Sequence, residues 1–424
     1  MEHWLERAAA MQPDRVAIAS PGYELTYSAL LEQARRAAGA LSTQGVRPGD
    51  RVALALAAGE ECAAAFHGCL LAGAIAVPID LRLTEQERAH RTGGTKTVVE
   101  SLLPGAPLAE SEPLELGAVA AVMHTSGTTG APRPVAITHG NWLASALASA
   151  VALGLDQDER WLCPMPLIHV GGLSIVVRSA IYATTAILHD RFDAEAVAAA
   201  LSDPEQRITL VSLVPTMLAR LLDAGLREPP TLRWALLGGG PIACTLLERA
   251  REASVPVAPT YGMTEACSQI ATFGWPLPGV DVELAVDGEI LVRGPTVAGG
   301  AVAPDGWLHT GDLGMLDEHG RLSIIGRKAD TIITGGENVA PAEVEAVLLD
   351  HPAVADAAVH GREDPEWGEA VVATVVLRDG ASADPGALRQ HCAARLAAFK
   401  VPKAIGFAGE LPRTASGKLV RSRL

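Results

Sequence analysis

The sequence predicts an α/β protein with a large N-terminal domain, a small β-rich subdomain attached to it, and a separate α+β domain at the C-terminus. Three observations predict this fold. Helix and strand patterns alternate over the first 120 residues, short strands with Gly and Pro turns fill residues 282–325, and a new pattern begins after Gly326. Strands that alternate with helices are typical of parallel sheets. A chain of 424 residues also exceeds the size of one compact core.

The N-terminal elements are predicted from helix caps and apolar spacing. Thr26 is expected to cap a helix whose apolar residues recur every three or four positions and which stops before Gly45. The apolar run 51–57 predicts a strand, and residues 62–79 indicate a buried helix followed by another strand. Residues 101–113, with three prolines and one glycine, are expected to form a surface connection.

The second half of the chain continues the alternation of strands and helices. Strands are expected over residues 210–214 and 235–237, and the second of these runs into a tight glycine turn. Pro341 is expected to open a helix, residues 371–377 to form a strand, and residues 387–399 to form a helix.

The change of pattern after Gly326 predicts the domain boundaries. We expect an N-terminal domain over residues 1–326, a hinge over residues 327–330 and a C-terminal domain over residues 331–424.

Charge and composition exclude several classes of function. The net charge is −15 and aromatic residues make up 4%, so neither phosphate neutralisation nor base stacking favours nucleic-acid binding. The six cysteines show no C-x-x-C pair and no zinc spacing, which indicates free thiols in a reducing compartment. Neither a signal peptide nor a membrane span is expected. We therefore expect a cytoplasmic protein, and a homo-oligomer is left open.

The strongest motif is a hydroxyl-rich loop that follows the apolar run 117–123. It reads His124-Thr-Ser-Gly-Thr-Thr-Gly-Ala-Pro-Arg-Pro, with four hydroxyls and two glycines within six residues. Glycines allow the backbone to approach an anion, and hydroxyls and amides donate hydrogen bonds to it, so the loop suits a polyphosphate. It is not a Walker loop, because no Gly-Lys-Ser/Thr ends it. A plain Ser/Thr/Gly turn is the alternative.

Four further segments carry weaker signals when each is taken alone. Tyr261-Gly-Met-Thr-Glu could place a hydroxyl on phosphate and a carboxylate on Mg²⁺, and His309-Thr-Gly-Asp could place a carboxylate on ribose hydroxyls. An Asp at a glycine turn is more often structural. Gly326-Arg-Lys-Ala-Asp-Thr-Ile-Ile-Thr-Gly-Gly-Glu-Asn lies at the expected domain junction. Lys418, within Pro412-Arg-Thr-Ala-Ser-Gly-Lys, is either a mobile cationic tip or a solvated lysine.

Taken together and in this order, the five segments resemble the adenylate-forming superfamily. This superfamily includes acyl- and aryl-CoA synthetases, luciferases and nonribosomal peptide adenylation domains. The resemblance spans residues 10–424 and implies stacked α/β subdomains, a mobile C-terminal domain, and activation of a carboxylic acid by ATP and Mg²⁺. Adenylation and thioester formation need different groups at one site, which a domain swing about the hinge can supply.

The resemblance also implies roles for individual residues. A phosphate loop would contact the β- and γ-phosphates. It consists of Thr125, Ser126, Gly127, Thr128, Thr129 and Gly130. The adenine and acyl pockets would be lined by Gly238, Gly239, Gly240, Tyr261, Gly262 and Met263. Catalysis would use Thr264 on the α-phosphate, Glu265 on Mg²⁺, Lys418 on the acyl carboxylate and α-phosphate, and His169 as an aromatic gate. The ribose would be held by Asp312 and Arg327, and Gly335 and Gly336 would face the pantetheine tunnel of coenzyme A.

A closer resemblance is to the o-succinylbenzoate–CoA ligases of menaquinone synthesis. It is carried by Asp158-Glu-Arg-Trp-Leu-Cys-Pro-Met-Pro-Leu-Ile-His-Val-Gly-Gly, by Leu236-Leu-Gly-Gly-Gly-Pro and by Tyr261-Gly-Met-Thr-Glu-Ala-Cys-Ser-Gln-Ile. Such a substrate carries a second carboxylate, which requires a cation in an apolar pocket. Arg178 is the candidate for that cation, with Ser212 and Thr216 as further polar contacts. The alternative for Arg178 is an ion pair with the protein's own acids.

The chain departs from the superfamily pattern at three places. Arg133 and Pro134 stand where Lys-Gly is usual, Ala329 stands at a hinge position that often carries Asp, and residues 272–279 lack several of the usual residues. Alternative functions are a CoA ligase with another acid, an adenylation enzyme that loads a carrier protein, and a nonenzymatic adenylate sensor. The presence of both Glu265 and Lys418 argues against the sensor, because binding alone needs neither.

Overall fold

The structure is a computed structural model that describes residues 1–102, 105–125, 133–413 and 419–424. The chain divides into two compact units. The first unit comprises Met1–Gly239, Ala253–Asp281 and Val292–Leu308, and the second comprises Gly240–Glu252, Val282–Leu291 and His309–Leu424. Among the described residues, none of the helices combines the length and hydrophobicity that a membrane crossing requires.

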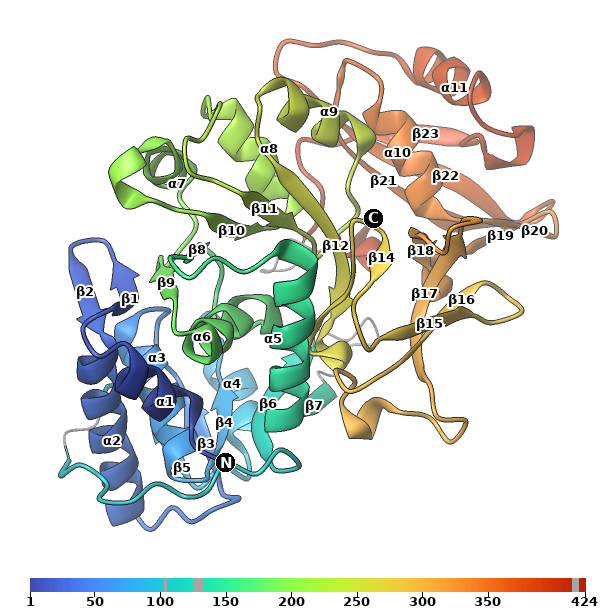
Figure 1. Ribbon diagram of the computed structural model, residues 1–424. Coiled ribbons are helices and arrows are strands. Elements are labelled where there is room, and N and C mark those ends of the chain that lie inside the picture. The colour runs from blue at the N-terminus through green and yellow to red at the C-terminus, as the bar shows by residue number, and fades with distance from the viewer. Residues whose placement is uncertain (103–104, 126–132, 414–418) are drawn as a thin grey trace. The chain divides into compact units, whose positions relative to one another are not determined.

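The first unit contains a nine-stranded sheet with a mostly parallel centre (Figure 1). Its order across the sheet is β14 (Trp275–Pro276), β13 (Ser268–Thr272), β12 (Val257–Met263), β11 (Trp234–Leu237), β10 (Leu210–Leu213), β8 (Arg160–Cys163), β9 (Thr185–Leu188), β1 (Val16–Ser20) and β2 (Tyr23–Thr26). Strands β12, β11, β10, β8, β9 and β1 run parallel, and antiparallel strands close both ends. The central strands are buried and short, as is typical of parallel sheets covered on both faces.

A second, five-stranded sheet also belongs to the first unit. Its order is β5 (Thr97–Val99), β3 (Arg51–Leu54), β4 (Ile75–Pro78), β6 (Val119–Thr125) and β7 (Arg133–Thr138). Strands β5, β3, β4 and β6 are parallel, and β7 returns antiparallel to β6. The β6–β7 hairpin therefore brackets the phosphate loop between Thr125 and Arg133.

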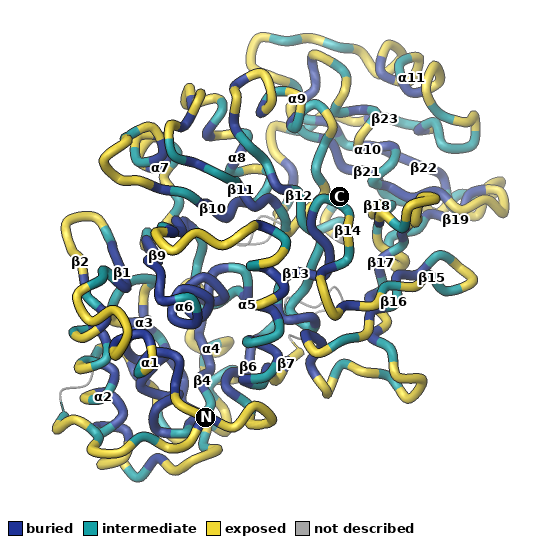
Figure 2. Tube along the Cα trace, viewed as in Figure 1, coloured by how far each residue is buried: buried dark blue, intermediate teal, exposed yellow. Residues whose placement is uncertain are grey.

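Helices of the first unit lie between the two sheets and on their outer faces. They are α1 (Trp4–Met11), α2 (Tyr27–Thr43), α3 (Glu60–Leu71), α4 (Glu85–Thr92), α5 (His139–Leu153), α6 (Val170–Tyr182), α7 (Ala194–Ser202) and α8 (Pro215–Asp223). Helix α5 contacts β7 of the smaller sheet and β13 of the larger one, and α6 packs against α5, β8 and β9. Figure 2 shows α6 as one of the most completely buried helices of this unit.

The second unit contains two further sheets. The four-stranded antiparallel sheet has the order β15 (Asp281–Leu284), β16 (Glu289–Arg293), β17 (Leu308–Leu316) and β18 (Leu322–Arg327). The five-stranded sheet is formed by β20 (Glu337–Val339), β19 (Ile332–Thr334), β22 (Gly368–Leu377), β21 (Val354–Asp364) and β23 (Ala404–Phe407). Its helices are α9 (Cys244–Glu252), α10 (Pro341–Leu349) and α11 (Pro385–Ala393).

Most predicted elements are confirmed, with differences at their ends. Thr26 caps α2 by accepting a hydrogen bond from the Ala29 N–H, and Pro341 opens α10. The strand expected over 51–57 is shorter, because β3 ends at Leu54. The helix expected over 387–399 is wrong in its C-terminal part, since α11 ends at Ala393 and the following turns carry Leu396 and Phe399 against the core of this sheet.

Candidate active site

Residues predicted to bind ligand follow four neighbouring parallel strands of the nine-stranded sheet. His169 follows β8, Thr216 follows β10, Gly238 follows β11, and Glu265 follows β12. The carboxyl ends of parallel strands meet at the same edge of a sheet, and ligands of open α/β sheets bind at that edge. The structure thus gathers, along one edge, the residues of the first unit that are predicted to contact adenine, the acid and Mg²⁺.

Two glycines at this edge are required by close packing. A Cβ on Gly238 would lie 2.8 Å from Cγ2 of Thr260, and a Cβ on Gly262 would lie 1.7 Å from the carbonyl oxygen of Ser268. Gly239 has a φ of +80°, a left-handed conformation that favours glycine. These contacts agree with the expectation that bulk is not tolerated here.

The Thr-Glu pair occupies a short 3₁₀ turn, Thr264–Ala266, directly after β12. The carbonyl of Glu265 accepts a hydrogen bond from the Ala298 N–H, which fixes the backbone of the turn. Strand β7 contacts this turn. The hairpin that carries the phosphate loop therefore lies against the residues predicted to contact the α-phosphate and Mg²⁺.

Arg178 lies on α6 and is 1% exposed. Its Nη2 donates a hydrogen bond to Oγ of Ser145 at 2.9 Å, and that hydroxyl donates to the carbonyl of Cys267 at 2.7 Å. The guanidinium also lies over the indole of Trp161, and Nε1 of Trp161 donates to Oγ of Ser212 at 2.9 Å. Two predicted substrate residues, Arg178 and Ser212, thus belong to one buried polar chain.

Arg178 makes no ion pair with an acidic side chain of the described residues, so the alternative of an internal ion pair is wrong. Its Nε has no hydrogen-bond partner among the described residues. Burial lowers the pKa of the guanidinium, but arginine remains charged in proteins. A buried cation without an acid is costly and favours an anionic ligand. The sequence could not reveal Ser145, Trp161 and Cys267 as neighbours, because they come from separate elements.

His169 and Thr216 take less buried positions at the same edge. His169 is the N-cap of α6 and is half-buried, and its carbonyl accepts hydrogen bonds from the N–H groups of Gly172 and Leu173. Thr216 lies in the first turn of α8 and is exposed. Tyr261 and Met263 are half-buried on β12.

In the second unit, Asp312 and Arg327 face each other across β17 and β18. Nε of Arg327 donates to Oδ1 of Asp312 at 2.7 Å, and Asp312 is buried while Arg327 is exposed. The structure therefore brings together the two residues predicted to hold ribose. Gly240 also belongs to the second unit.

Gly335 and Gly336 form the turn between β19 and β20. Their φ angles are +59° and +84°, and a Cβ on Gly335 would lie 3.0 Å from the Trp367 ring. The Gly335 N–H also donates to the Trp367 carbonyl at 2.8 Å. The turn is therefore held in one conformation that glycine alone adopts easily.

Lys328, which the sequence did not single out, lies within the expected hinge and forms ion pairs with two acidic side chains. Its Nζ lies 2.6 Å from Oδ2 of Asp287 and 2.9 Å from Oε2 of Glu289. Burial acts to raise the pKa of Glu289, but the hydrogen bonds from Lys328 and Gly311 outweigh it and the net pKa is lowered. The neighbouring Asp330 pairs with Arg421 at 2.8 Å. Partners about 40 and 90 residues away in sequence cannot be recognised from a local motif.

Six predicted residues lie outside the described residues. They are Ser126, Gly127, Thr128, Thr129, Gly130 and Lys418. Thr125, the first residue of the phosphate loop, is described, and its Oγ1 donates to the Arg133 carbonyl at 3.4 Å. Arg133 and Pro134 begin β7, so they belong to the hairpin stem rather than to the loop.

Comparison with known proteins shows the family to which the chain belongs. The model of the AMP-binding enzyme family matches residues 5–100 and 94–301, and that of the AMP-binding enzyme C-terminal domain matches residues 343–418. The chain is a member of the AMP-binding enzyme family. The 2-succinylbenzoate–CoA ligase of Bacillus licheniformis is 40% identical over the full length of both chains. That of Bacillus subtilis is 39% identical, over the full chain and 97% of the relative.

Solved structures of AMP-binding enzymes share the fold. The o-succinylbenzoate CoA synthetase of Bacillus subtilis, in complex with the acyl-adenylate intermediate, superposes with a TM-score of 0.93 at 38% identity over 100% of this chain and 98% of that one. The same enzyme with ATP and magnesium ion has a TM-score of 0.92 at 37% identity over 99% and 98%. MatB from Rhodopseudomonas palustris with ATP has a TM-score of 0.91 at 25% identity over 99% and 97%.

Proposed function

We propose that this chain is an acid–CoA ligase that activates 2-succinylbenzoate with ATP and transfers the acyl group from AMP to coenzyme A, as a step of menaquinone synthesis. The observation that carries the proposal is the similarity over the full chain to 2-succinylbenzoate–CoA ligases, in sequence and in fold. The gathering of the predicted ligand residues at one sheet edge supports it.

In the first half-reaction, a carboxylate of the acid attacks the α-phosphorus of ATP, and pyrophosphate leaves. Both reactants are negative, so the site must offset their repulsion. Thr264 donates to the α-phosphate, the phosphate loop donates to the β- and γ-phosphates, and Lys418 supplies positive charge where the carboxylate meets the phosphate. The contact of β7 with the Thr264–Ala266 turn supports the shared location of the loop and the Thr-Glu pair.

Mg²⁺ fits the donors of this edge. Glu265 offers one carboxylate at the end of β12, and a single carboxylate together with substrate phosphate oxygens is how Mg²⁺ is usually held in nucleotide sites. When bound there, the ion neutralises phosphate charge. The backbone of Glu265 is held by the hydrogen bond that its carbonyl accepts from the Ala298 N–H.

The second carboxylate of the substrate would bind Arg178. The guanidinium is buried, lacks an acidic partner among the described residues, and keeps one N–H unsatisfied. Ser212 extends the same polar chain through Trp161, and His169 would close the acyl pocket at the N-terminus of α6. Because Arg178 is 1% exposed, the carboxylate would be fully buried when bound, where charge-assisted hydrogen bonds are strongest.

Ribose recognition and the second half-reaction would use the second unit. Asp312 would accept the ribose hydroxyls while its ion pair with Arg327 holds the carboxylate in place. The turn Gly335–Gly336 would face pantetheine after residues 331–424 swing about the hinge 327–330. The free state of all six cysteines agrees with the cytoplasmic location that we propose.

A direct test is thioester formation by the purified chain with ATP, Mg²⁺, coenzyme A and a panel of acids. We expect 2-succinylbenzoyl-CoA and AMP to form, and benzoate or a fatty acid to react at least about tenfold more slowly, since each lacks the second carboxylate. If the chain reacts faster with another acid, that acid replaces 2-succinylbenzoate as the substrate. If the chain transfers the acyl group to a carrier protein and free coenzyme A does not compete, the carrier protein replaces coenzyme A as the acceptor.

A further inference from the structure

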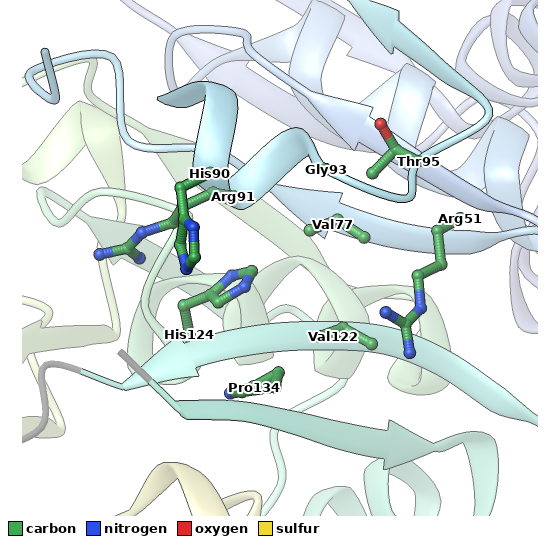
Figure 3. A pocket seen from close by; sticks show the side chains of 9 residues that line it. All are labelled: Arg51, Val77, His90, Arg91, Gly93, Thr95, Val122, His124 and Pro134. Atoms are coloured by element: carbon green, nitrogen blue, oxygen red, sulfur yellow. The ribbon is translucent and has the colours of Figure 1, made fainter. Parts of the chain in front are cut away.

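A cavity of about 180 Å³ lies over one face of the five-stranded sheet of the first unit, which contains β3 and β6, and is lined by basic groups (Figure 3). Arg51 lines it from β3, His124 from β6, and His90 and Arg91 from the last turn of α4. In Figure 3 the guanidinium of Arg91 points away from Arg51, with the rings of His90 and His124 between the two. Thr95 also lines the cavity, and its hydroxyl donates to the Thr92 carbonyl at 2.7 Å. None of these residues is assigned to ATP, acid or coenzyme A above.

No acidic side chain stands among the described residues that line this cavity. Neither Arg51 nor Arg91 forms an ion pair with an acidic side chain of the described residues. Glu87, one turn before Arg91, accepts hydrogen bonds from the backbone N–H and hydroxyl of Thr84, and these bonds lower its pKa more than the nearby charge of Arg91 does. In a chain of net charge −15, two arginines in a lining without acidic side chains give this small cavity a local positive charge.

His124 supplies an independent indication of a missing ligand. Its Nδ1 is buried and has no hydrogen-bond partner among the described residues. Burial lowers the pKa of His124 to about 4, and the charges of Arg91, Arg51 and His90 add to this effect. Buried polar atoms are normally satisfied, and an anion with hydroxyl or oxygen groups would satisfy this one while offsetting the surrounding positive charge.

The size of the cavity limits the ligand. Val77 and Val122, which come from the same sheet as Arg51 and His124, make part of the lining apolar. Pockets for drug-sized ligands usually have about 300–1,000 Å³, so this one suits a small anion rather than a nucleotide.

We propose that this cavity binds a small phosphate-class anion, either inorganic phosphate or pyrophosphate. Arg51 and Arg91 offset its charge, His124 completes its hydrogen bonds, and His90 lines the same cavity. The site goes beyond the ligase activity, although His124 directly precedes Thr125 and so joins the cavity to the phosphate loop. Its binding can be measured without any turnover.

The test is calorimetric titration of the full chain with phosphate and with pyrophosphate, in the absence of ATP and acid. We expect the double variant Arg51→Ala/Arg91→Ala to weaken binding at least about tenfold. Lys96→Ala, which removes one positive charge from an exposed neighbour of Thr95, should bind both anions as wild type does. The anion that binds more tightly, phosphate or pyrophosphate, is identified as the ligand, and tighter binding of either one supports the site.

A second measurement does not depend on a variant's stability. In wild type labelled at histidine, the ring resonances of His124, assigned by their loss in His124→Gln, should shift with the same midpoint as the calorimetric titration. Unchanged His124 resonances during anion binding would overturn the proposal. So would equal affinities of the Arg51→Ala/Arg91→Ala and Lys96→Ala variants.

Discussion

The guanidinium of Arg178 lies over the indole of Trp161, with Cζ 5.6 Å from the ring centroid. Both side chains are fully buried, and Trp161 in turn donates to Ser212. This contact joins α6 to β8 and β10 at the sheet edge where the predicted ligand residues gather. It leaves a buried cation whose described neighbours are hydroxyl, carbonyl and aromatic groups rather than carboxylates.

Replacement of Arg178 by Met, which keeps much of the side-chain volume, should raise the KM for 2-succinylbenzoate by about 10–100-fold, because a buried hydrogen bond to a charged group is lost. The KM for ATP should change by less than about threefold. Arg220→Ala, an exposed arginine on α8, is the matched control. Steady-state kinetics with each substrate varied in turn decide the matter, and equal effects on both KM values would remove Arg178 from the acid site.

Substitution of Gly262 by Ala should reduce the adenylation rate by about 10²-fold. The added Cβ would meet the Ser268 carbonyl at 1.7 Å, so β12 and β13 must separate and Thr264 and Glu265 must move, and displacements of about 1 Å cost this much. Gly299→Ala, where a Cβ meets nothing within 4 Å, should leave the rate unchanged. Acid-dependent pyrophosphate exchange measures both variants, and a Gly262→Ala enzyme of wild-type activity would show that the turn is not part of the site.

Lys328→Ala should change the two half-reactions by different factors. Lys328 joins the proposed hinge to Asp287 and Glu289, so its loss should alter the hinge without touching ATP or acid. We expect the substitution to change the rate of pyrophosphate exchange and the rate of thioester formation from preformed acyl-adenylate by factors that differ at least about threefold. Lys96→Ala is the control, because this lysine is exposed on the first unit, away from the hinge segment. Equal responses of both half-reactions would mean that the pair does not influence the hinge.

Stability of the first unit should fall in mild acid because of His67. Burial lowers the pKa of His67 to about 3, and the charge of His3 adds to this effect, whereas the unfolded chain has a histidine pKa of about 6.5. Above pH 6.5 the ring is neutral in both states. Below it, only the unfolded chain gains a proton, so the free energy of unfolding should fall by up to about 3 kcal/mol between pH 6.5 and 4.

Urea unfolding at several pH values measures this slope. His67→Gln should flatten it, and His319→Gln, at an exposed position, should not. A slope unchanged by His67→Gln would contradict a neutral buried imidazole.

Local signals in the sequence were sufficient for elements whose ends carry a cap, and insufficient where packing decides. Thr26 and Pro341 mark helix starts that the structure confirms. The Ala-rich run after Ala393 favours a helix by propensity, yet the chain leaves the helix there so that Leu396 and Phe399 can pack on the core. Tertiary contacts outweigh propensity in such a run.

The residues of the site fall into the same two groups, those that a local motif locates and those that only packing brings together. The glycines at 238 and 262 and the Thr-Glu pair belong to motifs of contiguous residues, so the sequence could locate them. The environment of Arg178 and the partners of Lys328 come from elements far apart in the chain, and no local pattern reveals them. The basic cavity was missed for this reason too, since Arg51, Arg91 and His124 share no motif.

The most direct measurement is pyrophosphate exchange into ATP that depends on 2-succinylbenzoate, in wild type and in Lys418→Ala. The account predicts exchange in the wild-type chain only when the acid is present, and a fall of about 10²–10³-fold in the variant, because one preorganised cationic donor is lost from the α-phosphate. Absence of acid-dependent exchange in the wild type, or equal exchange in the variant, would contradict it.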